Sequence, residues 1–100
     1  MTTTQTMTTP LSLDSIVRVG DDTIFRELNG EAVLLQLEAG MYYGLDPVGT
    51  RLWELIADHG ELRKVHAQAV QEFDVAADTL ERDLLALITQ LVDRGLVTAS

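Results

Sequence analysis

The residue types that most often carry out catalysis or bind metals are few in this chain and are poorly placed. His59 and His66 are seven residues apart with Gly60 between them, and no acidic residue stands beside them at the H-E-x-x-H spacing of a zinc site. No serine forms a plausible set with a histidine and an acid, because the serines lie in or near the termini: Ser12, Ser15 and Ser100. The chain has no cysteine, which excludes disulfides and thiolate chemistry. We therefore expect no enzymatic activity, no bound metal and no cofactor.

A cluster of carboxylates does stand near the start of the last predicted helix. Its members are Asp74, Asp78, Glu81 and Asp83. Negative side chains are stabilised near a helix N-terminus, and helical spacing turns these four in different directions, so the cluster does not indicate a metal site. The plain interpretation is a solvated helix start.

Overall charge and hydropathy narrow the class of protein further. The formal net charge is −9, with only seven basic residues, whereas nucleic-acid binders neutralise phosphates with clustered Lys and Arg. No segment approaches the roughly 18 apolar residues of a membrane helix, and the N-terminus lacks the features of a signal peptide. We expect a cytoplasmic protein with no nucleic-acid or membrane partner. The Thr-rich residues 1–14 predict a disordered tail, and residues 15–98 a single domain.

The elements that would position any functional residue begin with a hairpin. Asn29-Gly30 favours a two-residue type I′ turn between strands at 23–28 and 31–37. A glycine-containing connection then leads to a third strand, Met41–Leu45. Asp46-Pro47 ends the sheet and begins a helix, because aspartate caps a helix and proline is tolerated in its first turn.

Three helical stripes follow the strands. The first helix ends at Gly60, the second carries the stripe from Leu62 to Phe73, and the third runs from about Ala76 to Arg94. The predicted fold is α+β and winged helix-turn-helix-like, with a three-stranded antiparallel sheet followed by three helices. Two short apolar runs, Ile16–Val19 and Leu96-Val97, are consistent with either short strands or irregular apolar segments.

Two features exceed what ordinary packing requires. No further strand follows Met41–Leu45, so an open sheet edge is predicted there, and such an edge accepts another chain as an added strand. Tyr42 and Tyr43 face opposite sides of that strand, and the sequence leaves open which ring contacts a partner. The last helix has an apolar arc of about 160°, wider than the usual stripe of somewhat over 100°. We predict that one margin of this arc, formed by Leu85, Ile88 and Val92, lines a groove.

The ordered motifs resemble a known family. The segments EAVLLQLEAGMYYGLDPVGTRLWELIADHG and LERDLLALITQLVDRGLV resemble the PqqD-like family, with a match from about Thr23 to Val97. The resemblance implies a non-catalytic recognition element for ribosomally synthesised and post-translationally modified peptides (RiPPs). In this family the leader segment of a precursor peptide joins the third strand and lies against the third helix. Carried over to this chain, the peptide-binding residues are Met41, Tyr42, Tyr43, Gly44, Leu45, Asp78, Glu81, Asp83, Leu84, Leu85 and Ile88.

The resemblance leaves several pathways open. Lasso-peptide biosynthesis is favoured, with a cysteine-protease-like leader peptidase and an asparagine-synthetase-like cyclase as companions. The nearest alternative is a PqqD-type peptide chaperone beside a radical-SAM enzyme in PQQ biosynthesis. A subunit that only covers an apolar patch of an enzyme is a further possibility. A winged-helix DNA-binding regulator is disfavoured, because the last helix carries four acids against two arginines between Asp78 and Arg94.

Overall fold

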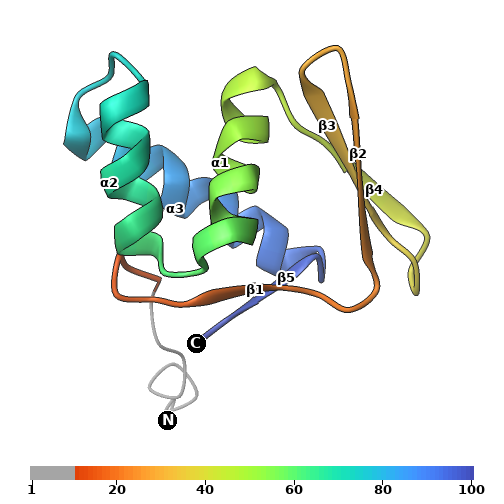
Figure 1. Ribbon diagram of the computed structural model, residues 1–100. Coiled ribbons are helices and arrows are strands. Elements are labelled where there is room, and N and C mark those ends of the chain that lie inside the picture. The colour runs from red at the N-terminus through yellow and green to blue at the C-terminus, as the bar shows by residue number, and fades with distance from the viewer. Residues whose placement is uncertain (1–10) are drawn as a thin grey trace, which may run out of the picture.

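The computed structural model describes residues 11–100, which fold into a small sheet, three helices and a two-stranded ribbon (Figure 1). The elements in chain order are β1 (Val17–Val19), β2 (Thr23–Leu28), β3 (Glu31–Gln36), β4 (Met41–Gly44), α1 (Pro47–His59), α2 (Leu62–Glu72), α3 (Ala77–Asp93) and β5 (Val97–Ala99). The predicted α+β architecture, a three-stranded antiparallel sheet followed by three helices, is confirmed.

The sheet is an antiparallel meander in the order β2-β3-β4. Asn29 and Gly30 both have positive φ, at 56° and 81°, as a type I′ turn requires, and the turn fixes the register that pairs Phe25 with Leu34. Because β3 is the central strand, β2 and β4 are both edges of this sheet. The open edge predicted at Met41–Leu45 is therefore present.

One face of the sheet, here called the inner face, is turned towards the helices. It consists of Phe25, Ala32, Leu34, Gln36 and Tyr43. Leu34 is completely buried in the core, and the Phe25 ring stacks on Trp53 of α1 with 6.3 Å between ring centroids. The contact of the sheet with α1 is therefore aromatic and aliphatic, and it fixes the helices against the sheet.

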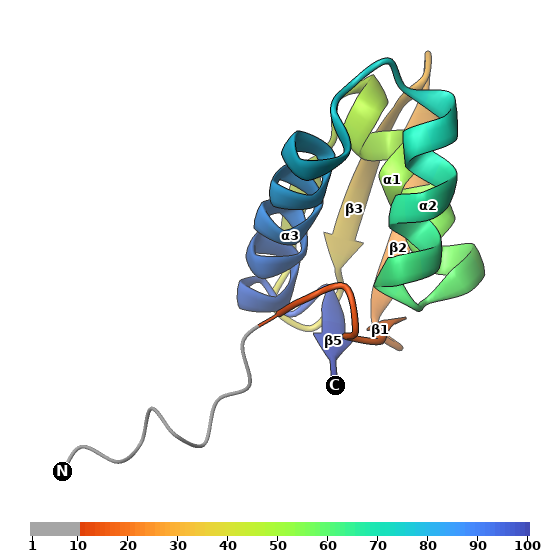
Figure 2. The same ribbon diagram turned by 90° about the vertical axis from the view of Figure 1, so that its left-hand side faces the viewer.

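The helices begin and end where the sequence predicts. The Asp46 carboxylate accepts a hydrogen bond from the Gly49 N–H at 2.7 Å, Pro47 is the first residue of α1, and Gly60 ends the helix with φ of 76°. Helix α1 lies between α2 and the sheet (Figure 1), and α3 lies beside the α1–α2 pair (Figure 2). Four residues of α3 are buried in the core that the helices share: Leu80, Leu84, Ile88 and Leu91.

The two segments that the sequence left undecided pair with each other. Strands β1 and β5 form an antiparallel ribbon in which Val17 is opposite Ala99 and Val19 is opposite Val97. The side chains of Val17 and Val97 are buried, so the ribbon closes one end of the core.

The tail prediction needs a correction at its C-terminal end. Leu11 and Leu13 pack against the core, and the carboxylate of Asp14 lies 2.7 Å from the guanidinium of Arg63. Residues 11–14 are thus part of the folded unit. The remainder of the predicted tail, residues 1–10, lies outside the described residues.

Candidate functional site

The free edge of β4 presents the backbone groups of two residues. The Leu45 N–H donates to the Ala32 carbonyl of β3 at 2.8 Å, and the register pairs Tyr43 with Leu34. Backbone hydrogen bonds alternate along an antiparallel strand, so Tyr43 directs its N–H and C=O towards β3. Tyr42 and Gly44 direct theirs away from the sheet. An incoming strand would therefore form its hydrogen bonds with Tyr42 and Gly44.

A buried threonine fixes the end of β4 against α1. The Thr50 hydroxyl accepts from the Ala32 N–H at 2.8 Å and donates to the Leu45 carbonyl at 3.4 Å. It thereby bridges two backbone groups that would otherwise bond directly across the β3–β4 ladder. The Thr50 side chain comes from the first turns of α1, whose start is set by Asp46 and Pro47. The position of β4 is consequently fixed by helix α1 as well as by β3.

A groove of about 350 Å³ lies beside β4, between this strand and helix α3. Its walls come from the end of β4, the start of α1 and one side of α3. The lining residues are Tyr43, Gly44, Leu45, Asp46, Val48, Gly49, Leu52, Asp83, Ala86, Leu87 and Gln90. The lining of the groove is thus mixed, with polar and apolar surface in about equal parts, and it includes the carboxylates of Asp46 and Asp83.

One end of this groove is closed by contacts between β4 and α3. The Tyr43 hydroxyl donates to Oε1 of Gln90, and the Arg94 guanidinium carbon lies 4.9 Å from the centroid of the Tyr43 ring. Tyr43 is therefore held by the helix and forms the groove wall. Tyr42 points to the other face of the sheet, and its side chain is 73% exposed.

The structure brings together only some of the residues that the sequence assigned to the site. Tyr43, Gly44, Leu45 and Asp83 line the groove, and Met41 and Tyr42 lie on the adjoining edge. Asp78 and Glu81 are on α3 but not in the groove lining. Three leucine or isoleucine positions also do not line it: Leu84, Leu85 and Ile88.

The groove does not lie along the predicted margin of the α3 apolar arc. Leu84 and Ile88 are completely buried in the core, and Leu85 packs against it, so none of them faces the groove. The groove follows the opposite margin, where Leu87 adjoins Asp83 and Gln90. Helical periodicity shows how wide an apolar arc is, but not which margin the sheet leaves uncovered. No pattern in the sequence indicated Gln90, because a polar residue at the edge of an apolar arc carries no sequence signal.

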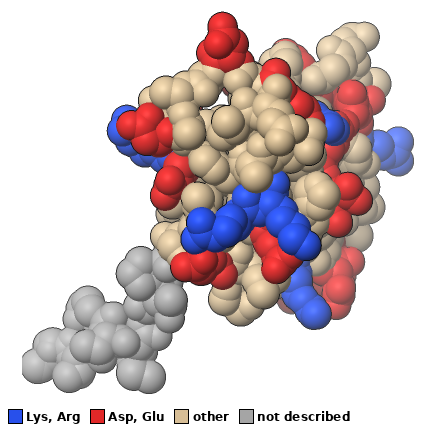
Figure 3. Space-filling model, turned by 60° about the vertical axis from the view of Figure 1, so that its left-hand side comes forward, with Lys and Arg blue, Asp and Glu red and all other residues tan. Residues whose placement is uncertain are grey.

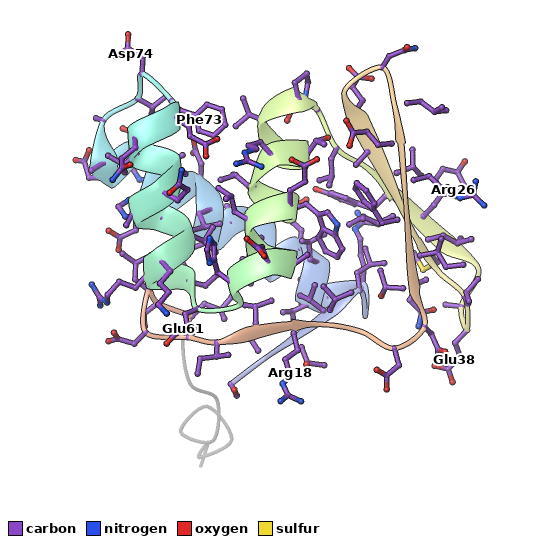
Figure 4. The ribbon with its side chains drawn as sticks, viewed as in Figure 1. Arg18, Arg26, Glu38, Glu61, Phe73 and Asp74 are labelled. Atoms are coloured by element: carbon purple, nitrogen blue, oxygen red, sulfur yellow. The ribbon has the colours of Figure 1, made fainter. Side chains whose placement is uncertain are left out.

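The sheet has a second exposed feature, on the face opposite the helices. This outer face consists of Ile24, Arg26, Leu28, Val33, Leu35 and Tyr42. Five of these residues surround a shallow, almost wholly apolar hollow of about 370 Å³: Ile24, Arg26, Val33, Leu35 and Tyr42. Figure 4 shows Arg26 pointing away from the helices. An apolar surface of this kind on a small domain is typical of a protein–protein contact.

The two histidines that were first considered as catalytic or metal-binding residues contact neighbouring groups of the protein. His66 contacts the backbone carbonyl of Ala77 at 2.7 Å, and His59 lies 3.8 Å from the carboxylate of Asp58. Among residues 11–100, no group of three or more His, Asp or Glu side chains is arranged to hold a metal ion. No helix in this part of the chain is long and apolar enough to cross a membrane.

Charged side chains on the helical side are mixed rather than segregated. Figure 3 shows Lys and Arg among Asp and Glu on the side where α2 lies, without a continuous basic surface on that face. Arg51 of α1 forms an ion pair with Glu72 of α2 at 2.7 Å, supported by Gln68. The hydrogen bonds from Arg51 and Gln68 lower the pKa of Glu72 from about 4.5 to about 2. These charges hold the two helices together and lie away from the groove.

Comparison with known proteins identifies the family. The model of the family described as coenzyme PQQ synthesis protein D (PqqD) matches residues 31–97, which include β3, β4 and all three helices. The chain belongs to the PqqD family. A comparison with curated protein sequences gives no significant match.

Two solved structures resemble this PqqD-family domain over most of its length. One is TbiB1 in complex with the TbiA(beta) leader peptide, which is 31% identical, covers 80% of this chain and 93% of that chain, and gives a TM-score of 0.76. The other is lasso peptide synthetase B1 complexed with the leader peptide, at 23% identity, 82% and 96% coverage, and a TM-score of 0.74. The second likeness concerns the fold, and the first also reflects similarity of sequence.

Proposed function

We propose that this domain is a non-catalytic RiPP recognition element, which binds the leader segment of a ribosomal precursor peptide and delivers it to a maturation enzyme. The observation that carries the proposal is the conjunction of a free β4 edge with a groove along α3 that has both apolar and polar walls. Such an edge binds an extended peptide through main-chain hydrogen bonds, and the groove receives its alternate side chains. Both similar structures are of proteins bound to a leader peptide, which supports the same ligand class here.

The physical properties of a leader peptide suit this mode of binding. An unbound leader is a short segment without a folded core, so strand addition requires no preformed shape in the ligand. Backbone bonds to Tyr42 and Gly44 would supply affinity that is independent of leader sequence. Side chains that enter the groove beside Leu87 and Leu52 would supply selectivity.

We further propose that the outer face contacts the enzyme that receives the peptide. Ile24, Val33 and Tyr42 leave apolar surface exposed there, on the face of the sheet turned away from the groove. A leader bound to β4 would extend this surface by one strand, so the enzyme would meet protein and peptide together. A leader peptidase is the favoured partner and a cyclase a second one. Because the precursor would still be unprocessed when it is bound, the proposal places the domain in the cytoplasm.

Lasso-peptide biosynthesis is the pathway we favour. One similar structure is a lasso peptide synthetase component, although its identity of 23% carries the fold alone. A PQQ-pathway chaperone role is the alternative, which the name of the matching family supports. A short precursor gene beside a peptidase and a cyclase gene would favour the first, and a radical-SAM gene the second.

The proposal is tested by titrating ¹⁵N-labelled protein with a synthetic leader from the precursor encoded beside this gene. We expect the amides of Tyr42 and Gly44 to shift and to become protected from hydrogen exchange, together with shifts in Leu87 and Gln90. Shifts confined to β2 or to α2, or no binding at millimolar peptide, would contradict it.

A further inference from the structure

The β4–α3 groove has acidic residues in its lining, and a basic residue, Arg94, lies beside its Tyr43 wall. Asp83 lines it together with Asp46, which lies just beyond the C-terminal end of β4. Arg94 stacks on the ring of Tyr43, the third of the four residues of that strand. Asp83 lies in α3, and Arg94, eleven residues further on, is the residue that follows the end of this helix; at 1.5 Å per residue the two are about 16 Å apart.

None of these groups is neutralised by an ion pair within the described part of the chain. The ion pairs of residues 11–100 involve Arg51, Arg63, Lys64 and His59, and neither Asp83 nor Arg94 takes part in one. One oxygen of Asp46 accepts the capping hydrogen bond from Gly49, which leaves its charge in place. Asp83 and Arg94 are both exposed, so a ligand that lies along the groove and extends past Tyr43 meets an anionic group and then a cationic one.

The direction of β4 relates this charge order to the direction of a bound strand. Along β4 the chain passes from the Arg94 end to the Asp83 end, because Tyr43 contacts Arg94 and Gln90 whereas Leu45 is followed by Asp46. The sheet is antiparallel throughout. A strand added in the same manner would run from the Asp83 end to the Arg94 end.

We propose that the charge order of the groove selects leaders with a basic residue on the N-terminal side of an acidic residue, and so fixes the direction of binding. Side chains that enter the groove from one strand are separated by an even number of residues. A spacing of four residues spans about 13 Å and one of six about 20 Å, which bracket the distance between Asp83 and Arg94. The inference rests on the proposed function, since it names the kind of peptide that this site prefers.

The test is a selection from a display library of random 16-residue peptides against the full-length protein. The decisive variant is the double charge reversal Asp83→Lys with Arg94→Glu, which leaves the net charge of the protein unchanged. The matched control is Arg82→Glu with Asp93→Lys, because these two exposed residues of α3 lie outside the groove lining. Binding to the three proteins is then measured for selected peptides and for the same peptides with the two charges exchanged.

The wild-type protein and the control are expected to enrich peptides with Lys or Arg four or six residues before Asp or Glu. Exchanging the two charges should weaken binding about fivefold, in line with two exposed ion pairs. The Asp83→Lys/Arg94→Glu variant should prefer the exchanged peptides by a similar factor. The preference should shrink in 0.5 M salt, because exposed charges are screened.

Three outcomes would overturn the inference in separable ways. Peptides that bind at β4 equally well with either charge order would overturn it and leave the proposed function standing. Enrichment of acidic-before-basic peptides by the wild-type protein would overturn the direction of binding. Failure to enrich any peptide whose binding shifts the amides of Tyr42 and Gly44 would overturn the proposed function itself.

Discussion

The sheet has two open edges, and they differ in how they are protected. β2 is six residues long and carries Arg26 and Glu27, whereas β4, with the sequence MYYG, carries no charge. Charged residues on an edge strand are a common defence against unwanted pairing. Both edges have unpaired backbone groups, so an open edge does not by itself mark a binding site. The edge without charged residues, β4, is the one that we propose binds the peptide.

The hollows beside the two edges also differ, in the side chains that line them. A hollow of about 460 Å³ adjoins β2 and is lined by Phe25, Trp53 and Val19, with Glu54 and Asp58 at its margin. Two of the protein's own aromatic rings, Phe25 and Trp53, are stacked there. The β4 groove has small residues in its lining, such as Ala86 and Gly49, beside larger ones, such as Tyr43 and Leu87. The hollow beside β2 therefore contains the protein's own stacked aromatic rings, whereas the groove beside β4 is the proposed site of the leader peptide.

The largest effect is expected from proline at the two edges. Tyr42→Pro removes a donor that points to the free side of β4 and blocks the neighbouring bonds of an added strand, and we expect leader affinity to fall about a hundredfold. Glu27→Pro is the matched change on β2, because the Leu37 N–H donates to the Asp22 carbonyl and the alternation turns the Glu27 N–H outwards. It should leave affinity within about twofold. Fluorescence anisotropy with a labelled leader measures both.

Tyr42→Ala separates the ring from the N–H, because it removes only the ring. It should retain most of the affinity, and circular dichroism checks that all three variants are folded. Equal losses of leader affinity in Tyr42→Pro and Glu27→Pro would contradict the proposed difference between the β2 and β4 edges.

A second variant, Thr50→Val, weakens the attachment of β4 to β3 and α1. The shape of the side chain is kept, but the Ala32 N–H loses its acceptor in a buried place. We expect the free energy of unfolding in urea to fall by about 1–2 kcal/mol. Hydrogen exchange should speed up at Ala32 and Leu45, while the β2–β3 amides keep their protection relative to global stability. Uniform loss of protection across the sheet would contradict a local role.

The third prediction removes the protection of β2. Replacing Arg26 and Glu27 together by Val should raise self-association about tenfold, measured by sedimentation velocity, because the strand becomes apolar on an open edge. The matched control is Arg18→Val with Glu38→Val, which makes the same change of charge at two exposed positions away from β2 (Figure 4). Leader affinity should be unchanged in both. Unchanged self-association in the β2 variant would show that Arg26 and Glu27 do not prevent this edge from pairing with another chain.

The smallest effect is expected for the stability of the folded protein at low pH. It involves Glu72 on the helical side, and it serves as a reference for the changes made at the two sheet edges. The pKa of Glu72 is about 2 when folded and about 4.5 ordinarily, so its ionised form stabilises the folded state above pH 4.5. That contribution is lost as the pH falls from 4.5 to 2. Glu72→Gln should flatten this part of the curve of melting temperature against pH, and leader affinity at pH 7 should stay the same. An identical pH profile in the variant would show that the ion pair with Arg51 does not matter in solution.

Local signals in the sequence were sufficient for the meander and the helices. Asn29-Gly30, Asp46-Pro47 and Gly60 each act within a few residues, so their effect can be predicted without knowledge of the rest of the fold. The family resemblance was likewise carried by ordered local motifs. Pairing of β1 with β5 joins residues about eighty positions apart, and a short apolar run gives no information about such a distant partner.

The site was harder to predict because it depends on how α3 is rotated against the sheet. Leu84 and Leu87 look alike in the sequence, yet one is in the core and the other lines the groove. The two tyrosines posed the same difficulty, and only the register shows that Tyr42 presents its backbone to the free edge while Tyr43 presents its ring to the groove. The members of each pair differ in burial, and that difference can be known only when the positions of the neighbouring elements are known.

The pairing of β1 with β5 also bears on how the domain can be joined to other proteins. The segment entering the domain and the segment leaving it are neighbours in one ribbon, with Val17 opposite Ala99. A polypeptide that arrives through one strand of a ribbon and departs through the other can be spliced into a loop of a larger enzyme without separating the ends of that loop. A domain inserted in this way would keep its β4 edge free, and it would add peptide recognition to the enzyme that carries it.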